Sequence, residues 1–270
     1  MSLPPPDSPP QAPAAANAAA RRPVTLVTGA ARRLGRAIAL HLAASGHDLA
    51  LHSRTLDAEA LATADEVRAL GGACEVFAAD FCDEAATRAL VPAVLARFGR
   101  LGQVVHNASM FQHDDVASFG YASLCAHACA NTGAGVLLAQ ALHQHLQATQ
   151  ARGALVLLLD QRLWNPNTDY LSYGLSKSGL EFLTRALARQ LAPQLRVVGV
   201  APGLTLGSDL IDAQQLQRLG ELSLTGQTVQ PDQVAQAVAL ALANGALTGS
   251  TLMVDCGYHL QPMARDFPFL

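Results

Sequence analysis

The sequence is poor in features that mark several classes of protein. Only 14% of its 270 residues are charged, and the formal net charge of −3 gives no electrostatic reason to expect nucleic acid or an anionic membrane as a partner. Small molecules are therefore the expected partners. The five cysteines are odd in number and form no C-x-x-C pair, so we expect no disulfide framework and a reducing compartment.

A metal centre is not expected either. Cys125, His127 and Cys129 are close in sequence, but on a helix His127 would point away from the two cysteines, which are spaced i and i+4. We interpret these cysteines as buried thiols in helix packing rather than as zinc ligands.

Residues 1–22 have no continuous apolar segment of the kind found in a secretory signal, although they are rich in proline and alanine. Elsewhere no uncharged apolar run reaches the length of a membrane span. We expect residues 1–22 to form a disordered tail, residues 23–270 to form one domain, and the protein to be cytoplasmic.

Apolar aliphatic residues are abundant: half of the chain is hydrophobic, although only 5% is aromatic. Short apolar runs alternate with amphipathic helical patterns, and this rhythm predicts βαβ units with right-handed crossovers. The continuous apolar runs indicate strands buried on both faces. We therefore predict an α/β fold, a single Rossmann-like doubly wound parallel sheet of about seven strands. The predicted strands are 24–28, 48–52, 75–79, 103–107, 154–159, 196–200 and 251–255. The predicted helices include 34–44, 58–70, 85–98 and 176–191.

The turn after the first strand has the composition of a dinucleotide site. It reads TGAARRLG over Thr28–Gly35, and a helix follows. Gly29 would allow a tight turn, Gly35 would let helix and strand pack closely, and the helix N-terminus would offer free N–H groups to a pyrophosphate.

The end of the second strand favours NADP(H). It reads His52-Ser53-Arg54 and has no acidic residue to accept from the ribose 2′-OH of NAD. Arg54, with Arg32 or Arg33, could instead pair with a 2′-phosphate, or Arg54 could be a solvated loop charge. Asp80, after the third strand, could hold the adenine amino group or cap the next helix.

Tyr173 and Lys177 are spaced i and i+4 and therefore share one face of a helix. A nearby ammonium would lower the tyrosine pKa towards the working pH and make Tyr173 a proton donor. Lys177 could also bind the nicotinamide ribose. Taken alone, this spacing commonly marks a surface pair.

Five motifs occur in the order and spacing of the short-chain dehydrogenase/reductase family: Thr28–Gly35, Asn107-Ala108-Ser109, Asn131, Tyr173 with Lys177, and Ala201-Pro202-Gly203. The chain resembles this family from Pro23 to Leu260. The resemblance implies that Asn131 holds its helix open for a water chain to Lys177. It also implies a homo-oligomer, a tetramer, with contacts from helices around 122–147 and 176–191. The implied cofactor-binding residues are Gly29, Arg32, Arg33, Leu34, Gly35, His52, Ser53, Arg54, Asp80, Phe81, Asn107, Ala108, Ser109, Tyr173, Lys177, Pro202, Gly203 and Leu204.

Two departures from the usual family pattern resemble the pteridine reductase branch, including the dihydromonapterin reductases. Arg33 stands where most members have a glycine, and Asp160, 13 residues before Tyr173, stands where most have a serine. The H-N-A-S motif and the closing V-D-C-G-Y-H-L (254–260) also resemble that branch. The resemblance implies that Phe111 stacks a pterin against the nicotinamide, and that Arg33 meets the pyrophosphate and the carbonyl edge of the pterin. The implied substrate-binding residues are Arg33, Ser109, Phe111, Asp160 and Tyr173.

For two of these residues another interpretation exists. Phe111 could be a loop aromatic packed into the core. Asp160 could be a structural hydrogen-bond partner near Tyr173, although an unpaired carboxylate at the end of so apolar a strand would be costly to bury, which favours a functional role.

The predicted function is NADPH-dependent reduction of a dihydropterin (dihydromonapterin, dihydrobiopterin or dihydrofolate) to its tetrahydro form. Tyr173 and Asp160 would deliver the proton, since a carboxyl group beside a tyrosine can relay one from water. The alternatives are a short-chain reductase for another carbonyl substrate and a catalytically silent NADP-binding sensor or scaffold.

Overall fold

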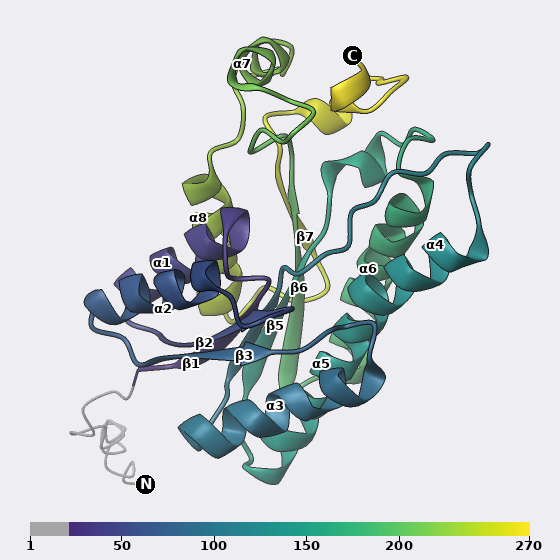
Figure 1. The fold of residues 1–270 in the computed structure, drawn as a ribbon. Coiled ribbons are helices and arrows are strands. Elements are labelled where there is room, and N and C mark those ends of the chain that lie inside the picture. The colour runs from purple at the N-terminus through teal and green to yellow at the C-terminus, as the bar shows by residue number, and fades with distance from the viewer. Residues whose placement is uncertain (1–21) are drawn as a thin grey trace, which may run out of the picture.

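Seven parallel strands form the centre of the protein in the computed structural model, which describes residues 22–270 (Figure 1). Their order across the sheet is β3-β2-β1-β4-β5-β6-β7, with every neighbouring pair parallel. The fold confirms the predicted doubly wound α/β sheet. The strands are β1 (Val24–Thr28), β2 (Asp48–Ser53), β3 (Cys74–Ala78), β4 (Gln103–His106), β5 (Gly153–Leu158), β6 (Leu195–Pro202) and β7 (Thr251–Val254).

Helices cover both faces of the sheet (Figure 1). Adjacent residues of the central strands point to opposite faces: Val105 and Val156 belong to one core cluster, and Val104 and Leu155 to the other. All four are fully buried, which explains why these strands are apolar without alternation. On one face lie α1 (Arg33–Ala44), α2 (Ala58–Ala69) and α8 (Pro231–Ala243). On the other lie α3 (Glu84–Phe98), α5 (Ala134–Ala148) and α6 (Leu171–Gln190).

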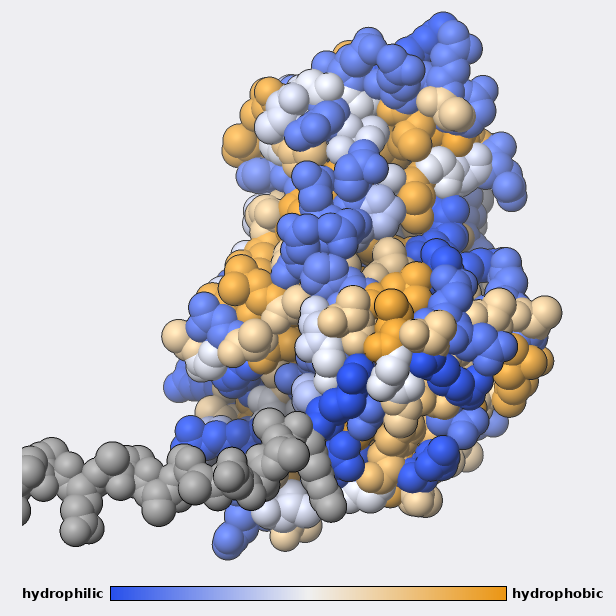
Figure 2. Space-filling model, turned by 90° about the vertical axis from the view of Figure 1, so that its left-hand side faces the viewer, coloured by the Kyte–Doolittle hydropathy of each residue, from blue (hydrophilic) through white to orange (hydrophobic). Residues whose placement is uncertain are grey.

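The strand order reverses between β1 and β4, and a crevice for ligands is expected beyond the carboxyl ends of strands at such a point. The helix α7 (Ala213–Glu221) and the C-terminal turns η3 (Tyr258–Leu260) and η4 (Phe267–Phe269) lie beyond the same ends, at the top of Figure 1. Figure 2 shows that this top end is mostly hydrophilic, whereas apolar residues are scattered over the helical layer below it.

One helical stretch contradicts the expectation that no uncharged apolar run reaches the length of a membrane span. The helix α4 (Tyr121–His127), the π-helical turn η1 (Ala128–Gly133) and α5 form a continuous helix of 28 residues, long and apolar enough by composition to cross a membrane. In the structure Leu138, Leu142 and Leu146 of this helix are buried in the core cluster shared with α3 and α6. The stretch is therefore accounted for as a core helix of the α/β domain.

Arg22 and the cysteines also differ from expectation. Arg22, assigned to the tail, packs on the fold, where its Nη2 donates to the carbonyl of Ala43 at 3.1 Å. The predicted disorder of the preceding residues lies outside the described residues.

Cys125 and Cys129 are exposed rather than buried, because their side of the helix faces solvent, whereas His127 is fully buried. Within residues 22–270, no three metal-binding side chains cluster.

Candidate active site

Two glycines shape the turn between β1 and α1. Gly29 has a φ of +63°, and a Cβ added there would lie 2.8 Å from the Cα of Ala108. A Cβ at Gly35 would lie 2.0 Å from the carbonyl oxygen of Gly29. Both positions therefore require glycine, and the first turn of α1 has neither a side-chain cap nor an acidic residue. This cradle fits a dinucleotide pyrophosphate.

Hydrogen bonds tie the ends of β1 and β4 together beneath this cradle. The Oγ1 of Thr28 accepts from the backbone N–H groups of Asn107 and Ala108, each at 3.0 Å. The Asn107 side chain donates to the carbonyls of Thr28 and Gly29 at 3.0 and 3.1 Å. Asn107 therefore holds the turn in place from within the crevice, while Ser109 is exposed beyond it.

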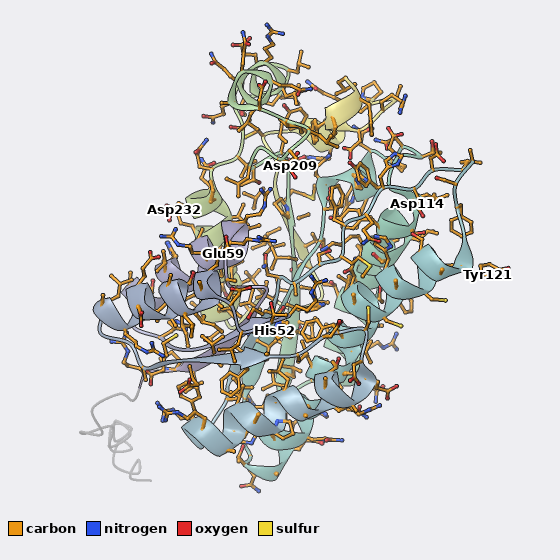
Figure 3. The ribbon with its side chains drawn as sticks, viewed as in Figure 1. His52, Glu59, Asp114, Tyr121, Asp209 and Asp232 are labelled. Carbon is orange, nitrogen blue, oxygen red and sulfur yellow. The ribbon has the colours of Figure 1, made fainter. Side chains whose placement is uncertain are left out.

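His52 supports the turn from below rather than pointing outward. Its Nε2 lies 3.0 Å from the carbonyl of Ala79, which can only accept, so Nδ1 accepts the Gly29 N–H at 3.3 Å. Burial lowers the pKa of His52 to about 4, and the neutral ring stacks on Phe81 with centroids 4.2 Å apart. His52 occupies the middle of the molecule in Figure 3.

Three side chains predicted to bind the cofactor lie near the ends of β1 and β2. Arg54 is exposed and makes no ion pair with any side chain of residues 22–270, whereas Arg32 pairs with Glu59 of α2 at 3.1 Å. Ser53 donates to the carbonyl of Thr55 at 2.6 Å. The charge on Arg54 therefore has no internal partner among the described residues.

Asp80 is exposed and accepts from the N–H of Cys82 at 2.9 Å. The interpretation of Asp80 as the cap of the next helix is wrong. Asp83 caps α3 instead, because its carboxylate accepts from Ala85 and Ala86. The alternative role of Asp80 toward an adenine stays a prediction.

The predicted proton donor and its carboxylate meet at the end of β5. Asp160 is the second residue after this strand, and its Oδ2 accepts the hydroxyl of Tyr173 from α6 at 2.8 Å. Lys177, one turn further along α6, donates from Nζ to the carbonyl of Leu158 at 2.6 Å, and its Nζ lies 5.6 Å from the centre of the Tyr173 ring. These three side chains form one cluster, which the sequence predicted.

The ionisation of this cluster differs from the prediction. Burial, reinforced by the Asp160 carboxylate, raises the pKa of Tyr173 well above 10. The expectation that Lys177 would lower the tyrosine pKa is therefore wrong in this environment. Burial also lowers the pKa of Lys177 to about 8, although Asp160 opposes this effect.

Asn131 lies in the π-helical turn η1. Its side chain donates to Met110 and Ser176 at 3.0 and 2.9 Å and accepts from the Met110 N–H at 2.6 Å. Its backbone carbonyl accepts from His106 Nε2 at 2.7 Å. Sequence reasoning did not predict that His106 is a hydrogen-bond partner of Asn131, although His106 is the first residue of the H-N-A-S motif.

A cavity of about 360 Å³ opens over this cluster. Phe111 at its wall is 51% exposed and stacks on Tyr170 at 4.2 Å, with its ring also edge-on to Tyr173 at 4.7 Å. The interpretation of Phe111 as a core aromatic is therefore wrong. Arg33 reaches the cavity from the cofactor turn with φ +53° and donates to the carbonyl of Gly207 at 3.0 Å. The predicted residues that line the cavity are Arg33, Leu34, Asn107, Ser109, Phe111, Asp160, Tyr173, Lys177, Pro202, Gly203 and Leu204.

Sequence reasoning missed a second group at the cavity wall. Arg162 and Tyr170 come from the segment between β5 and α6, and Asp266 and Phe267 come from the C-terminal segment. No local motif marks them. The only signal was a charged residue, Arg162, two positions after Asp160.

Comparison with known proteins places the chain in a family. A family model described as enoyl-(acyl carrier protein) reductase matches residues 29–259. The crystal structure of FolM alternative dihydrofolate reductase 1 from Brucella suis in complex with NADP superimposes with a TM-score of 0.84 at 34% identity, covering 91% of this chain and 98% of that one.

Two curated relatives have similar identity but different names. Pteridine reductase 1 of Leishmania tarentolae is 32% identical over 88% of this chain and 96% of its own length. A putative ketoacyl reductase 2 of the granaticin polyketide synthase of Streptomyces violaceoruber is also 32% identical, over 88% of this chain and 96% of its own length. Together with the Tyr173–Lys177 cluster on a Rossmann-like sheet, these matches show that the chain is an oxidoreductase of the short-chain dehydrogenase/reductase family.

Proposed function

We propose that the protein uses NADPH to reduce a dihydropterin to its tetrahydro form, with dihydromonapterin, dihydrobiopterin and dihydrofolate as candidate substrates. One observation carries the proposal: the Tyr173 hydroxyl donates to the Asp160 carboxylate at 2.8 Å, beside the half-exposed ring of Phe111. A serine in place of Asp160 would offer no carboxylate to relay a proton to the phenol oxygen. The pteridine reductase and the alternative dihydrofolate reductase among its relatives support the choice of substrate.

The cofactor fits the crevice at the switch point. Gly29 and Gly35 leave room for the backbone to approach a pyrophosphate, and the uncapped start of α1 offers N–H donors to it. Arg54 is free to pair with a 2′-phosphate. NADPH, when bound, supplies the hydride.

The proton for the substrate nitrogen comes from Tyr173. Because its pKa is raised well above 10, the phenol keeps its proton at neutral pH and is ready to donate when a C=N bond accepts hydride at carbon. After donation, a phenolate would face the Asp160 carboxylate, and two adjacent negative charges are unfavourable. Asp160 therefore takes a proton from water and returns it to the phenolate oxygen.

Phe111 provides the surface for a flat heterocycle. Tyr170 covers one face of its ring, and the ring remains half exposed. A pterin can stack on the uncovered face, which would gain roughly 0.5–1.5 kcal/mol beyond the area that it buries.

The test is steady-state kinetics with a dihydropterin and a panel of ketones. Asp160→Ser should lower pterin turnover by about 10²-fold or more, the usual scale of general acid catalysis. Phe111→Ala should weaken pterin binding and leave NADPH binding nearly unchanged. Asp209→Ser, which removes an exposed carboxylate between β6 and α7, is the matched control and should behave as wild type (Figure 3).

Other outcomes identify the rival functions. An enzyme for a simple ketone should tolerate Asp160→Ser or gain from it, since the usual serine of the family is restored. NADPH binding with no turnover of any of these substrates would instead favour a silent sensor or scaffold. Either result overturns the pterin assignment.

We also propose a homo-oligomer, a tetramer, with contacts from the continuous helix of α4, η1 and α5 and from α6. Leu183 and Leu187 of α6, with Leu191 at its end, pack against the core. The contact on α6 would therefore rest on Phe182, which is 65% exposed, and Leu175, which is 48% exposed. Light scattering of wild type and Phe182→Glu tests this, and a monomeric wild type would refute it.

A further inference from the structure

A buried arginine lies behind the proton donor. Arg162 belongs to the 3₁₀ turn η2 (Gln161–Trp164), and its side chain is only 7% exposed. Its Nη2 forms an ion pair with Asp266, and its Nε lies 4.0 Å from Oδ1 of Asp160. The guanidinium also lies 5.5 Å from the ring centres of Tyr170 and Tyr173. Arg162 therefore contacts both halves of the proton-donating pair.

The partner carboxylate comes from the far end of the chain. The C-terminal segment 261–270 folds back onto the loop between β5 and α6. There the Asp169 carboxylate accepts from the N–H of Asp266 at 2.8 Å and from Nε and Nη2 of Arg265 at 2.9 and 3.0 Å. Asn165 accepts the N–H of Met263 at 3.1 Å. These bonds hold Asp266 at the cavity, with its side chain 9% exposed.

Two carboxylates thus share one guanidinium. Burial opposes the charge on Arg162, but the carboxylates of Asp160 and Asp266 outweigh it and raise its pKa. Burial raises the pKa of Asp266, and Arg162 offsets this effect only in part. Asp160 and Asp266 therefore compete for the same positive charge.

We propose that Arg162 and Asp266 are positioning residues that set the proton affinity of the Asp160–Tyr173 pair, so that the C-terminal segment supplies a working part of the active site. This inference rests on the proposed function. The positive charge of Arg162 favours negative charge on the Asp160–Tyr173 pair, and Asp266 weakens that effect by pairing with Arg162. Removing either charge should change the proton affinity, and the two changes should have opposite signs.

The charged and titratable groups around the pair are few. Tyr173 and Lys177 face Asp160 from α6, Arg162 faces it from η2, and Asp266 faces it from the C-terminal segment. Tyr170 and Arg33 line the same cavity, while Asp169 pairs with Arg265 and its backbone carbonyl accepts from Nη1 of Arg162 at 3.1 Å. The signs of the expected effects therefore depend on Arg162 and Asp266.

The experiment compares the pH dependence of kcat/KM for pterin reduction. Activity falls with rising pH when the donor pair loses its proton. Asp266→Asn frees Arg162 to attract Asp160 and should move this fall to lower pH. Arg162→Gln should move it to higher pH. Each displacement should be about one pH unit, the lower end for a charge within about 4–6 Å. Arg162→Lys keeps the charge and should restore the wild-type profile.

Asp209→Asn is the matched control. It removes an exposed carboxylate outside the cavity lining, so the position of the fall should not change. NADPH binding and thermal unfolding of each variant report whether the fold is intact. Unmoved profiles in folded Asp266→Asn and Arg162→Gln, displacements of the same sign, or an equal displacement in Asp209→Asn would overturn the proposal.

A second measurement separates this inference from the choice of substrate. Lys177 is the only lysine of the chain, so ε-13C-lysine labelling gives one resonance, and the charge of Asp160 acts on it directly. The inflection of this resonance that reports ionisation of the Asp160–Tyr173 pair should move down in Asp266→Asn and up in Arg162→Gln without any substrate present. If these displacements appear but pterin is not reduced, the proposed function fails while the inference stands. If pterin is reduced and the inflection is unmoved, the inference fails alone.

Discussion

The pKa of Lys177 offers a direct test of the active-site electrostatics. Its side chain is almost fully buried, and burial lowers its pKa from the ordinary 10.5 to about 8. The difference corresponds to roughly 3.4 kcal/mol against the charged form, at 1.36 kcal/mol per pKa unit. Asp160 is the one charged group that opposes this cost. Asp160→Asn should therefore lower the pKa of Lys177 further, by about one unit.

The assay is the titration of the single ε-13C-lysine resonance in wild type and Asp160→Asn. Asp209→Asn, which removes an exposed carboxylate outside the cavity lining, should leave the midpoint unchanged. A wild-type midpoint near 10.5 would refute the burial argument. An unchanged or raised midpoint in Asp160→Asn would refute the role given to the Asp160 charge.

The same titration has a consequence for stability. Below pH 8 the lysine is charged in both folded and unfolded protein, and the folded state carries the full cost of burying it. Between pH 8 and 10.5 the unfolded state binds more protons, so this contribution favours folding increasingly as pH rises. Burial raises the pKa of Cys74 to about 12, which acts in the opposite direction above its ordinary value of 9.0. The contribution of Lys177 is therefore measured as the difference in free energy of unfolding between wild type and Lys177→Met. We expect the methionine variant to be the more stable below pH 8, because it buries no charge. The two free energies should then converge as pH rises from 8 to 10.5.

Tyr173→Phe should bind NADPH normally but lose about 10²-fold or more in kcat, because the proton donor is gone and little volume changes; near-normal kcat would contradict the mechanism. Arg54→Ala should weaken NADPH binding by about 1.5–3 kcal/mol and leave NADH almost unchanged, as measured by fluorescence titration of both cofactors. Equal losses for the two would refute pairing with the 2′-phosphate. Gly35→Ala should abolish cofactor binding or unfold the protein, since its Cβ would lie 2.0 Å from the Gly29 carbonyl; calorimetry would distinguish the two, and normal NADPH affinity would refute the cradle.

The fold was predictable because its strands are apolar on both faces. A run such as 154–159 reads as a buried parallel strand, and the structure has β5 at Gly153–Leu158. Boundaries were less predictable. The helix expected at 176–191 begins at Leu171, because Tyr170 adopts a left-handed conformation with φ 56° and ends the preceding loop, which no local propensity indicates.

The cluster around Asp160 was predictable because its members follow a strand or share a helix face. Its ionisation was not, because burial decides it and burial is a property of the packed molecule. The ion pair of Arg162 with Asp266 joins residues that are far apart in the sequence, and neither belongs to a pattern that periodicity or spacing can reveal. Such contacts can be read only from the three-dimensional structure.

Burial shifts the pKa values of Tyr173 and Lys177 in opposite directions but has the same consequence for both. It raises the pKa of Tyr173 and lowers that of Lys177, so it favours the neutral form of each. A neutral phenol can donate a proton but, at 6% exposure, can hardly regain one from bulk water. The Asp160 side chain is 24% exposed, opens onto the cavity and accepts the phenol hydroxyl. In the proposed mechanism protons therefore reach the buried donor through this carboxylate, and the usual serine of the family, which has no carboxylate, could not carry out the same exchange.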